Sequence, residues 1–196
     1  MKIQLTFSFA LAFFVGLSVP ASALETGKAA ISPEAGRTGG APAAGKRAVK
    51  AGDLAPAFAL RQFGGDFVFL KNYCGKTKKF PTVKAVLLDF FATDCVACVA
   101  QLGGLQTLAG QYSPGLETLL ISIDPQPEEV LPVFLKEEGV ELPVLTDMYR
   151  KTLSKYGFSS VPQTVLVDAD CNVVYVATKD GNGYTEISAR LKTLLK

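Results

Sequence analysis

A long apolar strand followed by an amphipathic helix is the feature that most limits the fold of this chain. The run KAVLLDFF, residues 84–91, is nearly all apolar, as in strands buried on both faces of a sheet. From Cys98 to Tyr112, apolar side chains recur every three or four residues, which predicts a helix with one buried face. A second apolar run, LETLLISID, covers residues 116–124. We therefore expect two parallel strands joined by a right-handed helical crossover.

The flanking segments supply the rest of a mixed α/β sheet. Apolar stretches on either side of residues 64–65 predict an N-terminal β-hairpin, and TVLVD with NVVYVA predicts a second hairpin. Helices are expected near residues 127–138 and 185–195. The glycines at 103–104 predict a kink in the crossover helix. This order of elements predicts an α/β fold in which helices cover both faces of a central mixed sheet.

The N-terminal segments are not expected to belong to the folded domain. Residues 1–23 combine a basic start, an apolar run and a small-residue cleavage site, the pattern of a secretory signal peptide. Residues 24–50 are rich in Ala, Gly and Pro and are expected to form a disordered linker. The folded domain would then cover residues 51–196. An uncleaved membrane anchor is the alternative, but the uncharged run is at the short end for spanning a bilayer.

Composition excludes several functional classes. The 20 basic and 18 acidic residues nearly balance, which gives no reason to expect nucleic acid or an anionic membrane as partner. The chain contains no histidine, so Ser-His catalysis, Cys-His catalysis and histidine-ligated metals are excluded. Export would place the mature chain where disulfides persist, so cysteine is interpreted first as redox chemistry.

The four cysteines carry the remaining chemistry. Cys95 and Cys98 form a Cys-Val-Ala-Cys motif at the start of the predicted helix, whereas Cys74 and Cys171 stand alone. A four-cysteine zinc site normally needs two close pairs, so neither a metal nor a cofactor is expected. In an exported chain the motif indicates a redox pair. A structural disulfide is the alternative, although so small a loop stabilises little.

The position of Cys95 favours an ionised sulfur. At the start of a helix, unpaired backbone N–H groups and the helix dipole stabilise the thiolate, so its pKa should fall well below about 8.5. Asp94, adjacent in the sequence, opposes this effect. Cys95 would attack a substrate disulfide, and Cys98, one turn further and facing inward, would resolve the mixed disulfide.

Asp89 is the acid predicted to assist Cys98. It lies in the middle of the first apolar run, where a carboxylate is costly unless it has partners. Burial would raise its pKa and make it a proton acceptor near neutral pH, through a bridging water. The alternative is that strand alternation turns Asp89 to solvent. Asp124, which ends the second run, is expected to be exposed.

Residues 52–196 resemble the thioredoxin superfamily, and within it the exported thiol-disulfide oxidoreductases of the TlpA/ResA-like branch. The resemblance rests on Gly52, Ala55, Pro56 and Phe58, on Asp89 six residues before the first cysteine, on Cys95 and Cys98, and on Val161-Pro162-Gln163-Thr164 at the family's cis-proline. It implies a thioredoxin-like fold with an additional N-terminal β-hairpin. It also implies that Pro162 packs beside Cys95 and presents backbone to an extended substrate.

The sequence departs from this branch close to the cysteines. Phe91 and Asp94 stand where the branch has tryptophans, and Val96 and Ala97 replace its usual residues between the cysteines. Gln101 and Gly103 stand where Glu and Pro are common. These departures bear on the redox potential and the partner surface, not on disulfide exchange.

The resemblance implies an enzyme that exchanges, and more specifically reduces, the disulfides of protein substrates. A membrane-embedded thiol electron donor would keep it reduced, and cytochrome c biogenesis or a similar maturation process would use it. The location would be periplasmic or otherwise extracytoplasmic, and we expect a monomer.

The family fold also bears on the two single cysteines. It places Cys74 and Cys171 at the end of the sheet away from the active site, which implies a structural disulfide between them. Two unrelated buried thiols are the alternative.

Two other functions stay open. A peroxidase of the peroxiredoxin class shares the fold, but Leu88 and Ala92 occupy the Pro and Thr positions of its motif before Cys95. A redox-inactive binding module would use the fold as a platform, and the intact cysteine pair argues against it.

Overall fold

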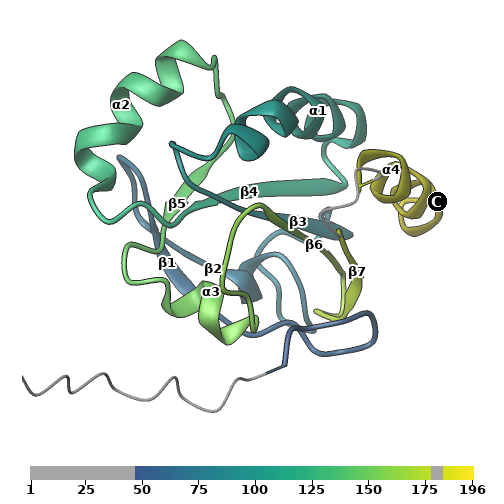
Figure 1. Ribbon diagram of the computed structural model, residues 1–196. Helices are drawn as coiled ribbons and strands as arrows, with labels where there is room; N and C mark the ends of the chain where they lie inside the picture. Colours follow the sequence, from purple (N-terminus) through teal and green to yellow (C-terminus); the bar gives the residue numbers. More distant parts are fainter. Residues whose placement is uncertain (1–46, 178–182) are drawn as a thin grey trace, which may run out of the picture. The chain divides into compact units, whose positions relative to one another are not determined.

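The computed structural model describes residues 47–177 and 183–196, and the elements in this part follow the predicted order (Figure 1). The expected signal peptide and residues 24–46 of the expected linker lie outside the described residues. The strands are β1 (Ala59–Gln62), β2 (Phe67–Phe69), β3 (Ala85–Phe91), β4 (Leu116–Ser122), β5 (Val144–Thr146), β6 (Gln163–Asp168) and β7 (Val173–Val176). The helices are α1 (Val96–Tyr112), α2 (Pro127–Glu137), α3 (Lys151–Lys155) and α4 (Gly183–Leu194), with a 3-10 turn at Leu70–Asn72.

Within the described residues, seven strands form one mixed sheet in the order β2-β1-β5-β4-β3-β6-β7. The two apolar runs are β3 and β4, which pair in parallel and are joined by α1. The two predicted hairpins are β1-β2 and β6-β7, both antiparallel. The structure therefore confirms the predicted mixed α/β sheet. Two short elements, β5 and α3, were not expected from the sequence.

Helices cover both faces of the sheet, so the inner strand β3 is buried throughout. Every residue of β3 is buried, and its side chains alternate between two apolar clusters. Leu87 and Phe91 pack with the residues of α1, α2 and α4, whereas Leu88 and Phe90 pack with those around α3 on the opposite face (Figure 1). Burying each of these side chains stabilises the fold by roughly 1.5–3 kcal/mol. By the same alternation, Asp89 points to the face that α1 covers.

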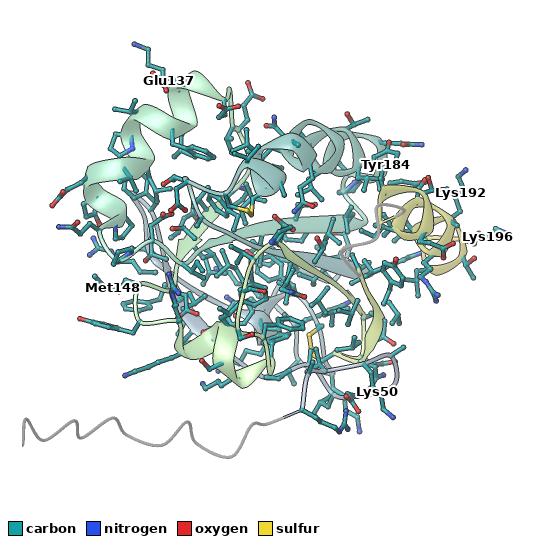
Figure 2. All side chains as sticks on the ribbon, viewed as in Figure 1. Lys50, Glu137, Met148, Tyr184, Lys192 and Lys196 are labelled. Carbon is teal, nitrogen blue, oxygen red and sulfur yellow. A yellow bond between two sulfur atoms is a disulfide. The ribbon has the colours of Figure 1, made fainter. Side chains whose placement is uncertain are left out.

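Gly104 in α1 serves helix packing, whereas a Cβ atom at Gly103 would have no neighbour within 4 Å. The helix is continuous from Val96 to Tyr112, through the residues 103–104 where we expected a kink. A Cβ atom at Gly104 would lie 3.2 Å from Cδ2 of Tyr184, at the start of α4 (Figure 2). The missing side chain therefore lets α4 approach α1 closely.

Ordered contacts begin before the expected start of the domain. The N–H of Val49 donates to the carbonyl of Tyr156 at 3.0 Å, and Arg47 forms an ion pair with Asp53 at 2.7 Å. Gly157 has a φ of +76°, and a Cβ atom there would collide with the backbone of this N-terminal segment. Only glycine fits at this close approach.

Cys74 and Cys171 form a disulfide that ties the segment after β2 to the β6-β7 turn. Their Cα atoms lie 5.1 Å apart, and Cys74 is buried in the cluster on the face opposite α1. Beside the bond, the N–H of Gly75 donates to the carbonyl of Ala169 at 2.7 Å. The crosslink joins residues that are 97 positions apart in the sequence.

Replacing Cys74 and Cys171 together by alanine should lower the free energy of unfolding by about 4 kcal/mol, because the crosslink restricts the unfolded chain. Chemical denaturation followed by circular dichroism measures this loss. The matched control replaces Cys95 and Cys98 by serine, which opens a loop of only 3 residues and should change stability much less. An equal loss of unfolding free energy in both double variants would contradict the structural role of the Cys74–Cys171 disulfide.

Candidate active site

Cys95 caps the start of α1, at the edge of the sheet where the parallel strands end. The chain leaves β3 at Phe91, and residue 95 is the N-cap of the helix, with extended backbone at φ −90° and ψ 97°. The backbone N–H of Cys98 donates to the sulfur of Cys95 at 3.2 Å, the contact that a serine or aspartate side chain makes at other helix starts. The polarised N–H groups and the helix dipole therefore act on this sulfur, as the sequence predicts.

The two sulfur atoms of the motif differ in their access to solvent. Cys95 and Cys98 are bonded in the structure, with Cα atoms 5.2 Å apart, so the structure describes the oxidised pair (Figure 2). Cys98 is fully buried, whereas Cys95 is partly exposed and Val96 beside it is 84 % exposed. Cys95 is thus the more accessible of the two residues, which is the asymmetry that disulfide exchange through a mixed intermediate needs.

Asp89 is a fully buried carboxyl on the same face as Cys98. Its Oδ1 accepts hydrogen bonds from Nε2 of Gln101 at 2.8 Å and from Oγ1 of Thr164 at 2.7 Å. Its Oδ2 has no hydrogen-bond partner among the described residues. Burial raises the pKa of Asp89 from 3.8 to about 7, and the two hydrogen bonds oppose this rise. The carboxyl can therefore exchange a proton near neutral pH. The alternative orientation toward solvent is excluded, because α1 covers this face.

Pro162 lies just before β6, and the Val161–Pro162 peptide bond is cis. Pro162 lines a cavity of about 380 Å³ together with Ala97, which stands between the two cysteines. Gln101 and Thr164, the donors to the buried carboxyl, line the same cavity. The cavity therefore connects the surface beside the cysteine pair with the partners of the buried acid.

Asp124 corrects one expectation from the sequence, because it is buried and only 7 % exposed. Its Oδ1 accepts from Oγ1 of Thr93 at 3.0 Å and from the N–H of Thr93 at 3.2 Å. Its Oδ2 accepts from Oγ of Ser122 at 2.8 Å. We expected exposure because Asp124 follows the end of a strand, but the loop that leads to Cys95 covers that end. Asp124 thus anchors this loop two residues before Cys95.

Sequence reasoning did not assign roles to four polar side chains of the site: Thr93, Gln101, Asp124 and Thr164. A signal was available for Asp124, because the carboxyl ends of neighbouring parallel strands meet at one edge of a sheet. Gln101 stands three residues after Cys98, a spacing that puts both on one helix face. Thr164 faces Asp89 only through the register of β3 against β6, which the sequence pattern does not define.

Residues 47–177 and 183–196 contain no group of three or more Cys, Asp or Glu side chains placed to hold a metal ion. In the same part of the chain, no helix is long and apolar enough to cross a membrane.

The chain is similar to known proteins over most of the described residues. Residues 51–176 match the AhpC/TSA family. The chain is 30% identical over 139 residues to the thiol-disulfide oxidoreductase ResA of Bacillus subtilis (strain 168), covering 69% of this chain and 71% of that protein. It is 27% identical over 138 residues to ResA of Halalkalibacterium halodurans, covering 70% of this chain and 72% of that protein.

A solved structure is also similar to this one. A putative thiol:disulfide interchange protein DsbE from Chlorobium tepidum matches with a TM-score of 0.65 over 76% of this chain and 99% of that chain. Its sequence identity of 22% means that this likeness bears on the fold alone, which it confirms as thioredoxin-like. From the family match and the curated relatives, we conclude that the chain belongs to the AhpC/TSA family and is a thiol-disulfide oxidoreductase.

Proposed function

We propose that this enzyme reduces disulfides of exported protein substrates through its Cys-Val-Ala-Cys pair. The observation that carries the proposal is the difference between the two cysteines: Cys95 is partly exposed at the helix start and Cys98 is fully buried behind it. The signal-peptide pattern of residues 1–23 supports an extracytoplasmic, periplasmic-type location. The direction of electron flow, a membrane thiol donor and a role in cytochrome c maturation are supported by the resemblance to the ResA-like branch.

The reaction would proceed in two exchange steps. The thiolate of Cys95 attacks one sulfur of the substrate disulfide, and the other substrate sulfur leaves as a thiolate that takes a proton from solvent. Cys98 then loses its proton, and its sulfur attacks Cys95 and displaces the bound substrate sulfur. Two electrons pass to the substrate, and the pair ends as the Cys95–Cys98 disulfide that the structure contains. The membrane donor would return two electrons to complete the cycle.

Asp89 would accept the proton of Cys98. Because Cys98 is fully buried, bulk water cannot take the proton directly. The carboxyl on the same face has a free oxygen and a pKa raised by burial to about 7, which suits proton transfer near neutral pH. A water molecule entering from the adjoining cavity would bridge the two groups, as the sequence predicts.

Pro162 and Asp124 would position the two reactants. Pro162 lines the cavity beside the cysteine pair, where its backbone can guide an extended substrate segment. Asp124 holds Thr93 through its side chain and its backbone N–H, which fixes the loop before Cys95. Both roles are geometric, because neither side chain takes part in the exchange of bonds.

Replacing Cys95 by serine should abolish insulin reduction, and replacing Cys98 by serine should leave a stable mixed disulfide with the substrate. Mass spectrometry of the trapped species and an insulin turbidity assay check both results. The matched control, in which Cys74 and Cys171 are replaced by alanine, should stay active at a temperature where it is folded. Reduction that survives Cys95→Ser would contradict the proposal, and peroxide consumption faster than insulin reduction would favour the peroxidase.

Replacing Asp89 by asparagine should slow resolution of the mixed disulfide and also stabilise the protein at alkaline pH. The folded carboxyl keeps its proton up to about pH 7, whereas the unfolded one releases it near 3.8, so stability falls as pH rises between these values. Asparagine removes this cost, so the variant should gain up to about 4 kcal/mol at pH 8 and little at pH 4. Urea unfolding at the two pH values measures the difference. A gain independent of pH would contradict a raised pKa for Asp89.

Replacing Asp124 by alanine should reduce kcat/KM for disulfide reduction by about 10-fold, because the loop before Cys95 loses contacts to a charged group worth about 1.5 kcal/mol. Faster hydrogen exchange at the N–H of Thr93 would show directly that the loop is released. Asp124→Asn, which keeps an acceptor, should recover most of the activity. The control is Asp147→Ala, because Asp147 is another buried acid whose side chain accepts instead from the N–H of Leu153. An equal loss in the control would contradict the role of Asp124.

A further inference from the structure

Gln101 is the polar link between the buried carboxyl and the cavity. It lies on α1, three residues after Cys98, and is partly buried. Its Nε2 donates to Oδ1 of Asp89 at 2.8 Å, and its side chain also lines the cavity of about 380 Å³. A carboxylate can only accept hydrogen bonds, so the amide presents its nitrogen to Asp89. Gln101 therefore stands between the acid and the space through which water can approach.

The two oxygens of Asp89 are used differently. Oδ1 receives both hydrogen bonds, from the Gln101 amide and from the Thr164 hydroxyl at 2.7 Å. Oδ2 is buried and has no partner among residues 47–177 and 183–196. Two donors saturate the lone pairs of Oδ1, so a proton can be added only at Oδ2. The pair of donors thus determines which oxygen is free to react.

The donors to Asp89 carry no charge, and few titratable groups face it. α1 contributes Cys98, and α4 contributes Tyr184 to the wall of the adjoining cavity. In the neighbouring strands the residues opposite Asp89 are Leu120 on β4 and Thr164 on β6, and neither titrates. Among the described residues, the charge state of Asp89 therefore depends on burial, on its two uncharged donors and, in the reduced pair, on the thiol of Cys98.

We propose that Gln101 is a positioning residue for proton transfer, which holds Asp89 by Oδ1 together with Thr164 and leaves Oδ2 to accept the proton of Cys98. The inference rests on the proposed function, because Asp89 acts as acceptor only if Cys98 resolves a mixed disulfide. In that step the proton passes from Sγ of Cys98 to Oδ2 of Asp89, directly or through one water. The sulfur of Cys98 bonds to Cys95, and the bond between Cys95 and the substrate sulfur breaks.

An amide at position 101 suits this task because it stabilises the carboxylate without adding a second charge. Asp89 must be ionised before it can accept a proton, and hydrogen bonds to the charged form favour that state. A carboxylate at position 101 would instead repel Asp89 and couple two titrations. With Gln101, position 101 adds no second carboxyl to the site, so the ionisation of Asp89 couples only to the thiol of Cys98.

The test compares three variants of the full chain: Gln101→Met, Thr164→Val and Thr164→Ser. Carbon-13 NMR follows the carboxyl shift of Asp89 in the reduced protein, and single-turnover kinetics follow resolution of the mixed disulfide against pH. Both Gln101→Met and Thr164→Val remove one hydrogen bond to the charged carboxylate. Each should therefore raise the midpoint of the NMR titration and the midpoint of the rate against pH by about one pH unit. Thr164→Ser keeps a hydroxyl and should restore the wild-type midpoint.

The matched control is Gln106→Met, because Gln106 lies on the same helix and accepts a hydrogen bond from the N–H of Glu141 at 2.9 Å, away from Asp89. Its midpoints should equal those of the wild type. Unchanged midpoints in Gln101→Met and Thr164→Val, or an equal shift in the control, would overturn the inference. If either Gln101→Met or Thr164→Val does not fold, the midpoints of the other variant test the inference. If the wild type shows no disulfide exchange, the proposed function fails, whereas the NMR titration still tests the link between Gln101 and Asp89.

Discussion

The contact between the sulfur of Cys95 and the N–H of Cys98 is the interaction on which the site depends. This contact makes Cys95 the N-cap of α1. The first turn of the helix therefore separates the outer sulfur, that of Cys95, from the inner sulfur, that of Cys98. Parallel pairing of β3 with β4 requires a crossover helix, and the helix must start at the carboxyl edge of the sheet. The fold therefore places the polarised end of α1 where a substrate can reach it.

The buried acid Asp89 shows a conflict between stability and its proposed role in proton transfer. A carboxyl in the middle of an apolar strand costs folding free energy once it is ionised, and only part of that cost is offset by Gln101 and Thr164. Both faces of β3 are covered by the apolar core, and burial of that core stabilises the fold enough to offset the cost of the buried Asp89. Such local conflict is expected where a residue serves chemistry rather than packing. The disulfide between Cys74 and Cys171 adds stability on the opposite face of the sheet.

Much of the fold follows from local pattern, because β3, β4 and α1 are long enough for their periods to be recognised. The elements β5 and α3 have 3 and 5 residues, too few to show a period, and β5 forms as the partner of the free edge of β4. In the site, spacing identifies the cysteines, and an acid among apolar residues identifies Asp89. The partners of Asp89 depend on strand register and helix docking, which are tertiary properties. The burial of Asp124 was predicted wrongly for the same reason, because a loop distant in sequence covers it.

Ionisation of Cys95 is the most direct test of this account. The ultraviolet absorbance of the thiolate in Cys98→Ala protein that keeps its Cys74–Cys171 disulfide, followed against pH, reports the pKa of Cys95, the one free thiol left in this variant. If the start of α1 stabilises the anionic sulfur, the midpoint lies well below about 8.5, the value of a free cysteine. A midpoint at or above that value would show that Asp94 or burial outweighs the helix, and it would contradict the proposed role of Cys95 as the nucleophile.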